Sequence, residues 1–237
     1  MYMHRIPITV DPHDTDLNGV CRASALLQYL QTAADHQLAE RGMTYEALRA
    51  QNRAFLLSRI QMEFTDSPRA YTHLLSGTTP CESRGFRFLR CYELTQDDVV
   101  IGRAVSVWAL IDTESRALIR SESFPLPCPL SEAPSVVPAP IRFPSLLREI
   151  GTYTVTYAEL DQNAHMNNTH YPDIYAHFLP MRGHRIEGLS ISYMHEARQG
   201  DVLRVLCAEA DGVYYFRTLL ADGTVNTEAE VRLASLL

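Results

Sequence analysis

Asp161, Asn163 and His165 are the residues whose types and spacing best suit chemistry in this sequence. In an extended segment, side chains two residues apart point to the same face, so a carboxylate, a carboxamide and an imidazole would converge. Such a set could activate a water for attack on an acyl carbonyl while a donor stabilises the developing oxyanion. The alternative is a turn whose Asn and Asp side chains only bond nearby backbone.

Glu196 is a second carboxylate that could join this set. It follows a predicted strand, residues 189–193, in which apolar residues alternate with serines. The alternative for Glu196 is a solvent-exposed acid at the end of a strand. Asn167 and Asn168 come directly after the cluster, and we expect them to cap a helix and to brace the loop.

The first half of the chain predicts a strand, one long helix and then several antiparallel strands. Apolar residues at helical spacing favour a helix over residues 23–41, which Gly42 ends. Thr44 can cap a second, short helix over residues 45–51. Alternating apolar residues then predict strands at residues 60–64, 86–94 and 105–111.

The second half repeats this plan, with a strand at residues 152–157, the polar loop, and a helix over 169–179 that Pro180 ends. Further strands follow, with hairpin turns predicted at Asp211-Gly212 and Asp222-Gly223. Between the halves, residues 125–144 hold seven of the chain's 13 prolines, which exclude a helix interior and a central strand. We therefore expect an N-terminal domain over 1–124, a linker over 125–144 and a C-terminal domain over 145–237.

The two polar loops align with each other. Asp16 and Asn18 correspond to Asp161 and Asn163, but Val20 stands where the second half has His165. This is the pattern of two tandem copies of one domain. We expect the second copy to carry the chemistry and the first to be a degenerate site that serves packing or substrate binding.

The composition is that of an ordinary globular protein, with 46% apolar and 21% charged residues in a chain of 237. A formal net charge of −7 argues against nucleic-acid binding. All 21 basic residues are arginine, which excludes Schiff-base lysine chemistry and a P-loop. Five scattered cysteines indicate reduced thiols rather than disulfides or a zinc site. Without a membrane-length apolar run or a charged leader, the sequence predicts a cytoplasmic protein that does not bind membranes.

The string Asp161-x-Asn163-x-His165-x-Asn167-Asn168, followed by Tyr193-x-x-Glu196, resembles the acyl-acyl carrier protein (acyl-ACP) thioesterases of plant plastids and bacteria. Three stretches of the first half are similar to that family's N-terminal domain: residues 59–62, 83–90 and 102–108. The resemblance implies an α+β fold of two tandem hot-dog domains, each a curved antiparallel sheet wrapped around one long helix. It also implies an acyl-ACP hydrolase of fatty acid biosynthesis that uses neither a cofactor nor a metal.

Carried over by position, the resemblance implies a catalytic network of Asp161, Asn163, His165 and Glu196. Glu196 or His165 would activate water, His165 could protonate the leaving sulfur, Asn163 would position the carbonyl and Asp161 would orient the others. Many plant members have Cys directly after this Glu, whereas this chain has Ala197, so a cysteine nucleophile is impossible there.

The resemblance further places the acyl chain in the N-terminal half, in a tunnel near Leu26, Leu30, Ile60, Met62 and Phe64. The partner would be an acidic carrier protein, for which Arg84, Arg87 and Arg90, or Arg182 and Arg185, could form a basic surface. Exposed sheet edges are compatible with a homodimer. Two alternatives stay open, an acyl-CoA thioesterase of the same fold and a non-catalytic acyl-binding hot-dog protein.

Overall fold

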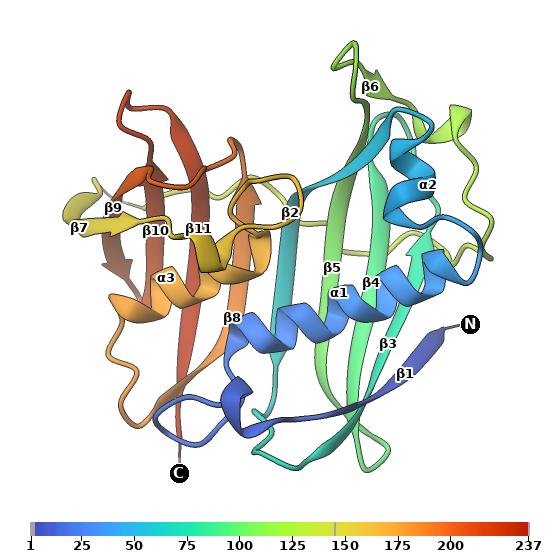
Figure 1. The fold of residues 1–237 in the computed structure, drawn as a ribbon. Helices are drawn as coiled ribbons and strands as arrows, with labels where there is room; N and C mark the ends of the chain where they lie inside the picture. The colour runs from blue at the N-terminus through green and yellow to red at the C-terminus, as the bar shows by residue number, and fades with distance from the viewer. Residues whose placement is uncertain (1–2, 145, 237) are drawn as a thin grey trace.

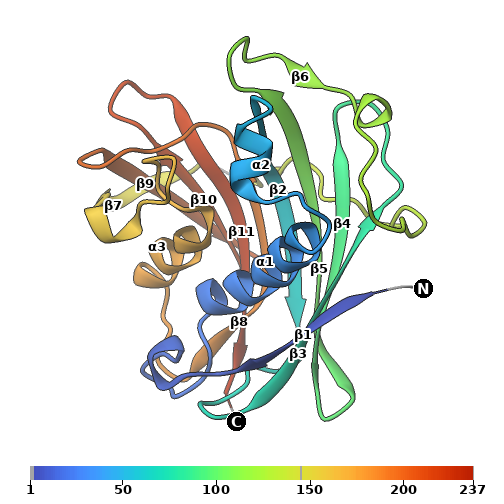
Figure 2. The same cartoon turned by 45° about the vertical axis from the view of Figure 1, so that its right-hand side comes forward.

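The computed structural model describes residues 3–144 and 146–236, so the expected domain limits at 1, 145 and 237 lie outside the described residues. The described residues form one eleven-stranded antiparallel sheet with helices on its concave side. Figures 1 and 2 show the sheet curving around the long helix α1 (Ala23–Ala39), which lies across its strands. This is the α+β architecture that the sequence predicts.

The N-terminal half contributes the strand order β1-β3-β4-β5-β2, with β6 paired to β5. The short helix α2 follows α1 and precedes β2. The bounds of these elements are β1 His4–Thr9, α2 Tyr45–Arg49, β2 Arg53–Phe64, β3 His73–Cys81, β4 Phe88–Gln96, β5 Val99–Asp112 and β6 Leu118–Ile119.

The C-terminal half contributes the order β8-β11-β10-β9-β7, which mirrors the first half strand for strand. The predicted duplication is therefore present in the fold. Its elements are β7 Arg148–Thr154, α3 Tyr171–His177, β8 His184–Tyr193, β9 Val202–Ala210, β10 Val213–Leu219 and β11 Val225–Ser235. Gly212 and Gly223 lie in the turns of the two predicted hairpins with φ of 76° and 87°, a conformation that favours glycine.

The two halves meet where β2 pairs with β8. Ile60 lies opposite Ile191 and Met62 opposite Leu189, and all four side chains are buried. Arg232 of β11 also forms an ion pair with Glu63 of β2. We call this β2–β8 pairing the central junction; it makes one continuous sheet and one main core out of two domains.

The described residues 124–144 and 146–147, between the end of a 3-10 turn at Ser123 and the start of β7 at Arg148, form neither a helix nor a regular strand. This proline-rich segment runs along the sheet, where Ser131 pairs with Cys81 of β3. Val137 packs against a small cluster on β3, β4 and β5. The prolines thus prevent regular structure, but the segment is attached to the first domain.

Within residues 3–144 and 146–236, a long helix is present in the first half alone. α1 covers Ala23–Ala39, close to the predicted range, and Thr44 caps α2 by accepting a hydrogen bond from the amide of Ala47 at 3.2 Å. The helix predicted over 169–179 is shorter, because a 3-10 turn occupies Asn168–His170 and α3 covers only Tyr171–His177. In the part of the chain that the structure describes, no helix is long and apolar enough to span a membrane.

Candidate active site

Asp161, Asn163 and His165 lie on a tight turn rather than on the extended segment expected from their spacing. One carboxylate oxygen of Asp161 accepts from the amides of Asn163 at 2.7 Å and His165 at 3.4 Å. The turn closes when the amide of Asp161 donates to the carbonyl of His165 at 2.8 Å, and Ala164 takes φ of 60°. Asp161 therefore holds the turn, and the side chains of Asn163 and His165 both line one cavity.

His165 and Glu196 form the closest pair of titratable groups in this cavity. Nε2 of His165 lies 3.3 Å from Oε2 of Glu196, and the two side chains are 23% and 37% exposed. The backbone produces this approach: His165 bridges Arg198, and the amide of Met166 donates to the carbonyl of Ala197 at 2.8 Å. The strand end that carries Glu196 is thereby attached to the turn that carries His165.

Asn163 is held from the other half of the molecule. The hydroxyl of Tyr45, the first residue of α2, donates to Oδ1 of Asn163 at 2.8 Å. Nδ2 of Asn163 faces Oδ2 of Asp161 at 3.4 Å. Sequence reasoning missed Tyr45, because 118 positions separate it from Asn163 and no motif links them.

The cavity that holds these groups has a volume of about 920 Å³ and lies between the two halves. At one side it is lined by the turn of residues 161–166 and the strand end of residues 193–196. The N-terminal half supplies an apolar wall from α1, α2 and the strands that follow: Ala34, Leu38, Leu48, residues 54–57, Phe88 and Trp108. The arrangement places polar groups beside a space that can hold an apolar chain.

The residues expected to line an acyl tunnel do not line this cavity. Leu26, Leu30, Ile60, Met62 and Phe64 are each at most 3% exposed and belong to the closed core beneath α1. The cavity opens further along the same elements, at the second half of α1 and the first residues of β2. The five predicted residues thus lie on elements that border the cavity but point into the core, and their role in binding an acyl chain stays a prediction.

A buried tyrosine, Tyr171, and a half-buried one, Tyr193, lie next to the site and line the cavity. The hydroxyl of Tyr193 donates to the carbonyl of Asn168 at 2.9 Å, and that of Tyr171 accepts from Nδ2 of Asn226 at 2.9 Å. Burial raises the pKa of Tyr171 to about 12, so this hydroxyl stays neutral near pH 7. Asn167 caps the following turn through the amide of Thr169 at 3.0 Å, as predicted.

The arginines named as a basic surface differ in exposure. Arg84, Arg87 and Arg182 are exposed, whereas Arg90 is 6% exposed and donates to Gln37 and Thr78 inside the first domain. Arg185 donates to two backbone carbonyls at the end of β2. Arg90 is therefore wrongly assigned to a docking surface.

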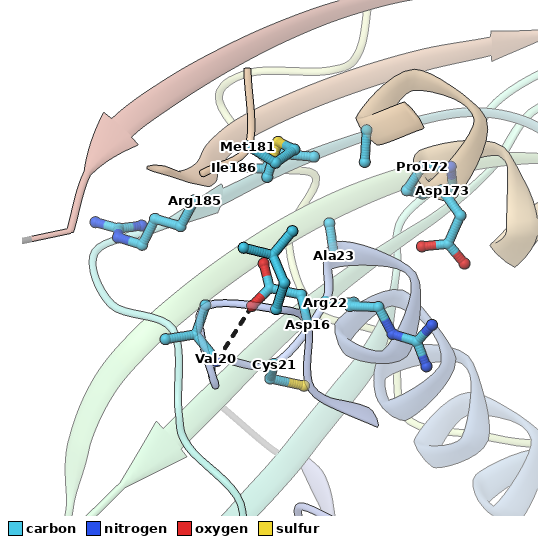
Figure 3. Close-up of a pocket in the computed structure, with 12 residues that line it drawn as sticks. Asp16, Val20, Cys21, Arg22, Ala23, Pro172, Asp173, Met181, Arg185 and Ile186 are labelled. Atoms are coloured by element: carbon cyan, nitrogen blue, oxygen red, sulfur yellow. Dashed lines mark hydrogen bonds between the residues drawn. The ribbon is translucent and has the colours of Figure 1, made fainter. Parts of the chain in front are cut away.

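The turn of the first half, residues 16–20, repeats the hydrogen bonds of the turn of residues 161–165. Oδ1 of Asp16 accepts from the amides of Asn18 at 2.8 Å and Val20 at 3.4 Å, the second bond being drawn in Figure 3. Val20 bridges Arg69 as His165 bridges Arg198, so Ser67 corresponds to Glu196. This turn lines a pocket of only about 180 Å³, with neither His nor Glu in its lining.

Comparison with solved structures identifies the class of fold. The chain superposes with a TM-score of 0.85 on an acyl-ACP thioesterase from Bacteroides thetaiotaomicron VPI-5482, at 23% identity over 98% of both chains. It superposes with a TM-score of 0.81 on a 12:0-ACP thioesterase from Umbellularia californica, at 16% identity over 98% of this chain and 97% of the other. This is the double hot-dog fold. No curated protein sequence matches the chain.

Comparison with family models then identifies the family. The model described as acyl-ACP thioesterase N-terminal domain matches residues 1–123, and the model of the C-terminal domain matches residues 147–234. The chain belongs to the acyl-ACP thioesterase family, whose members are thioester hydrolases that act on fatty acyl-ACP.

Proposed function

We propose that this protein releases free fatty acid from acyl-ACP at the cavity between its two halves, by direct attack of water. The observation that carries the proposal is the approach of His165 Nε2 to Glu196 Oε2, 3.3 Å apart, beside Asn163 in a cavity with an apolar wall. An imidazole and a carboxylate at this separation can share and move one proton.

In the proposed reaction, a water oxygen bonds to the thioester carbonyl carbon and the carbon–sulfur bond breaks. The His165–Glu196 pair takes the proton from water and delivers it to the leaving sulfur, so a carboxylic acid and a carrier thiol result. Nδ2 of Asn163 donates to the carbonyl oxygen as its negative charge develops. Asp161 acts through the backbone, because its carboxylate is occupied by the amides of the turn.

The proposed reaction has no cysteine-bound intermediate. Among the described residues that line the cavity, none is cysteine, and the position after Glu196 is a fully buried alanine. Iodoacetamide should leave the activity intact, and no acyl-cysteine should accumulate with a slow thioester. A trapped acyl-cysteine would overturn this part of the proposal.

We propose that the acyl chain occupies the wall formed by Ala34, Leu38 and residues 54–57, and that the carrier approaches from the side of Arg49 and Arg116. Both arginines line the cavity. An acidic carrier would meet positive charge there in spite of the net charge of −7. The cytoplasm, where fatty acid synthesis supplies acyl-ACP, is the proposed compartment.

A homodimer is a separate part of the proposal, supported by the two edge strands β1 and β7 of the open sheet. Light scattering on the purified protein tests it. We expect twice the monomer mass, and a single species at the monomer mass would reject the dimer without affecting the catalytic proposal.

The test of the function is a panel of acyl-ACP and acyl-CoA thioesters of increasing chain length, assayed with wild type, His165→Ala and Asn163→Ala. We expect kcat/KM to favour the carrier thioester and to fall sharply in both variants. A preference for acyl-CoA would support the second candidate, an acyl-CoA thioesterase. Equal inertness of all three proteins, with acyl chains still bound, would indicate a binding protein instead.

A further inference from the structure

Tyr45 is the only described side chain of the N-terminal half with a hydrogen bond to the side chain of Asn163. Its position is well defined: Thr44 caps the helix that begins at Tyr45, and Leu48, one turn later, is 8% exposed. The guanidinium of Arg49 lies 5.7 Å from the centre of the Tyr45 ring. Tyr45 therefore reaches the turn of Asn163 from a helix that is capped at its N-terminus and packed through Leu48.

The contacts of Asn163 define which end of its amide faces which partner. A carboxylate without a proton only accepts hydrogen bonds, so the amide nitrogen must face Asp161 and the amide oxygen must face Tyr45. With the oxygen occupied by the tyrosine hydroxyl, one N–H of Asn163 is left for a ligand in the cavity. If the amide rotated by half a turn, its oxygen would face the carbonyl oxygen of the substrate and repel it.

In the degenerate half, the corresponding Asn18 also donates to the aspartate of its own turn, with Nδ2 3.2 Å from Oδ2 of Asp16, but its remaining partners are all backbone groups. Oδ1 of Asn18 accepts from the amide of Gly183 at 2.9 Å, and Nδ2 donates to the carbonyls of Met181 at 2.7 Å and His184 at 3.1 Å. Both ends of that amide are used, so it can bind no substrate. In the catalytic half a single hydroxyl from α2 replaces this backbone clamp, and a donor is left over.

We propose that Tyr45 is a positioning residue, which holds the Asn163 amide with its N–H toward the thioester carbonyl. The catalytic site is then built from both halves: Asp161 of the second domain holds the amide nitrogen of Asn163, and Tyr45 of the first domain holds the amide oxygen. This inference rests on the proposed hydrolase function and assigns to the first domain a role beyond binding the acyl chain.

A double-mutant cycle tests the inference through kcat and KM of wild type, Tyr45→Phe, Asn163→Ala and the double variant. Tyr45→Phe removes only the hydroxyl, and we expect kcat to fall about 10-fold, the effect of one hydrogen bond of about 1.4 kcal/mol, with little change in KM. In the Asn163→Ala background the same change should alter kcat less than about two-fold, since its target is gone. Equal losses in both backgrounds, or no loss, would overturn the proposal.

Tyr157→Phe is the matched control, because Tyr157 is 78% exposed, four positions before Asp161, and should leave kcat unchanged. A second readout is independent of activity: the side-chain amide signals of Asn163 in a nitrogen–proton NMR spectrum, assigned by their loss in Asn163→Ala. Tyr45→Phe should shift them, and Tyr157→Phe should not. Unchanged signals in Tyr45→Phe would reject the contact between Tyr45 and Asn163. This readout does not depend on activity, so it distinguishes failure of the Tyr45 proposal from failure of the proposed hydrolase function.

Discussion

The two polar turns, Asp16–Val20 and Asp161–His165, have the same backbone hydrogen bonds but different side chains at their last position. In each, the aspartate holds the turn, and the residue after the turn donates to a strand end, Cys21 to Pro68 at 2.7 Å and Met166 to Ala197 at 2.8 Å. The shared geometry shows that Asp and Asn at these positions are first of all parts of a turn.

What differs is the His165–Glu196 pair and the space in front of it. Val20 and Ser67 replace His165 and Glu196, and the cavity shrinks from about 920 to about 180 Å³. The shared asparagine also differs in its contacts: Asn18 bonds backbone groups of residues 181–184, whereas Asn163 accepts from the Tyr45 hydroxyl and lines the larger cavity. The Asp and Asn of the motif therefore predict only the turn, and a prediction of chemistry also needs the His and the Glu.

The largest expected contrast is between His165 and Val20. Because general acid–base groups contribute about 10²- to 10⁴-fold, His165→Ala should lower kcat/KM by about 10³-fold. Val20→Ala should leave kcat/KM within about two-fold and instead lower the unfolding free energy by about 1–2 kcal/mol, since Val20 is 2% exposed. Steady-state kinetics and urea unfolding on both variants measure this. A large activity loss in Val20→Ala would show that the first turn is not degenerate.

The next contrast is between the two asparagines. Asn163→Ala should lower kcat about 10²-fold, as the loss of one oxyanion donor does, with little effect on stability. Asn18→Ala should leave kcat unchanged but destabilise by about 1–3 kcal/mol, because the bonds to Met181, Gly183 and His184 are lost together. Kinetics and unfolding of both variants measure this. If Asn18→Ala lowered kcat and Asn163→Ala lowered stability instead, the two roles would be the reverse of those predicted.

A third contrast lies one residue after each turn, where the first half has Cys21 and the second has Met166. Burial raises the pKa of the Cys21 thiol from 9.0 to about 12. The thiol is neutral in both states below pH 9. Above pH 9 the unfolded chain loses this proton while the folded chain keeps it, so stability falls between about pH 9 and 12.

Cys21→Ala should remove this contribution, whose limiting slope is about 1.4 kcal/mol per pH unit. Urea unfolding of wild type and variant at pH 8, 9 and 10 measures the difference in slope. Parallel curves would mean that the Cys21 thiol ionises as readily in the folded protein as in the unfolded chain.

The smallest contrast concerns the left-handed residue of each turn, Gly19 with φ of 71° and Ala164 with φ of 60°. A residue with a Cβ is strained there, so Gly19→Ala should destabilise and Ala164→Gly should stabilise, each by about 0.5–1 kcal/mol. Thermal unfolding would show opposite shifts of Tm. Shifts of the same sign would indicate that the surroundings of the two turns, and not the backbone conformation, decide whether glycine or alanine is more stable there.

The duplication and the proline-rich connection can be predicted from the sequence, because alternation and proline density are local patterns. The residues alone leave Glu196 open as a solvent-exposed acid, and only the family resemblance implies that it joins His165, which lies 3.3 Å away. The tight turn could be expected from its Asp and Asn as readily as an extended segment, and local hydrogen bonds favour the turn. The sequence could not show that Leu26 and Ile60 lie in the core while later residues of α1 and earlier residues of β2 line the cavity. That division depends on how the helix packs against the sheet. Tyr45 could not be found either, since its relation to Asn163 exists only in three dimensions.

The central junction has one further consequence, for a chain cut in the linker. Residues 59–63 of β2 pair with residues 188–192 of β8, and the two halves also share buried contacts and the Glu63–Arg232 ion pair. Covalent continuity through the prolines is therefore not what keeps the halves together. Two separately expressed fragments, ending and beginning within residues 125–144, should assemble into an active heterodimer, so this architecture lends itself to split-enzyme complementation.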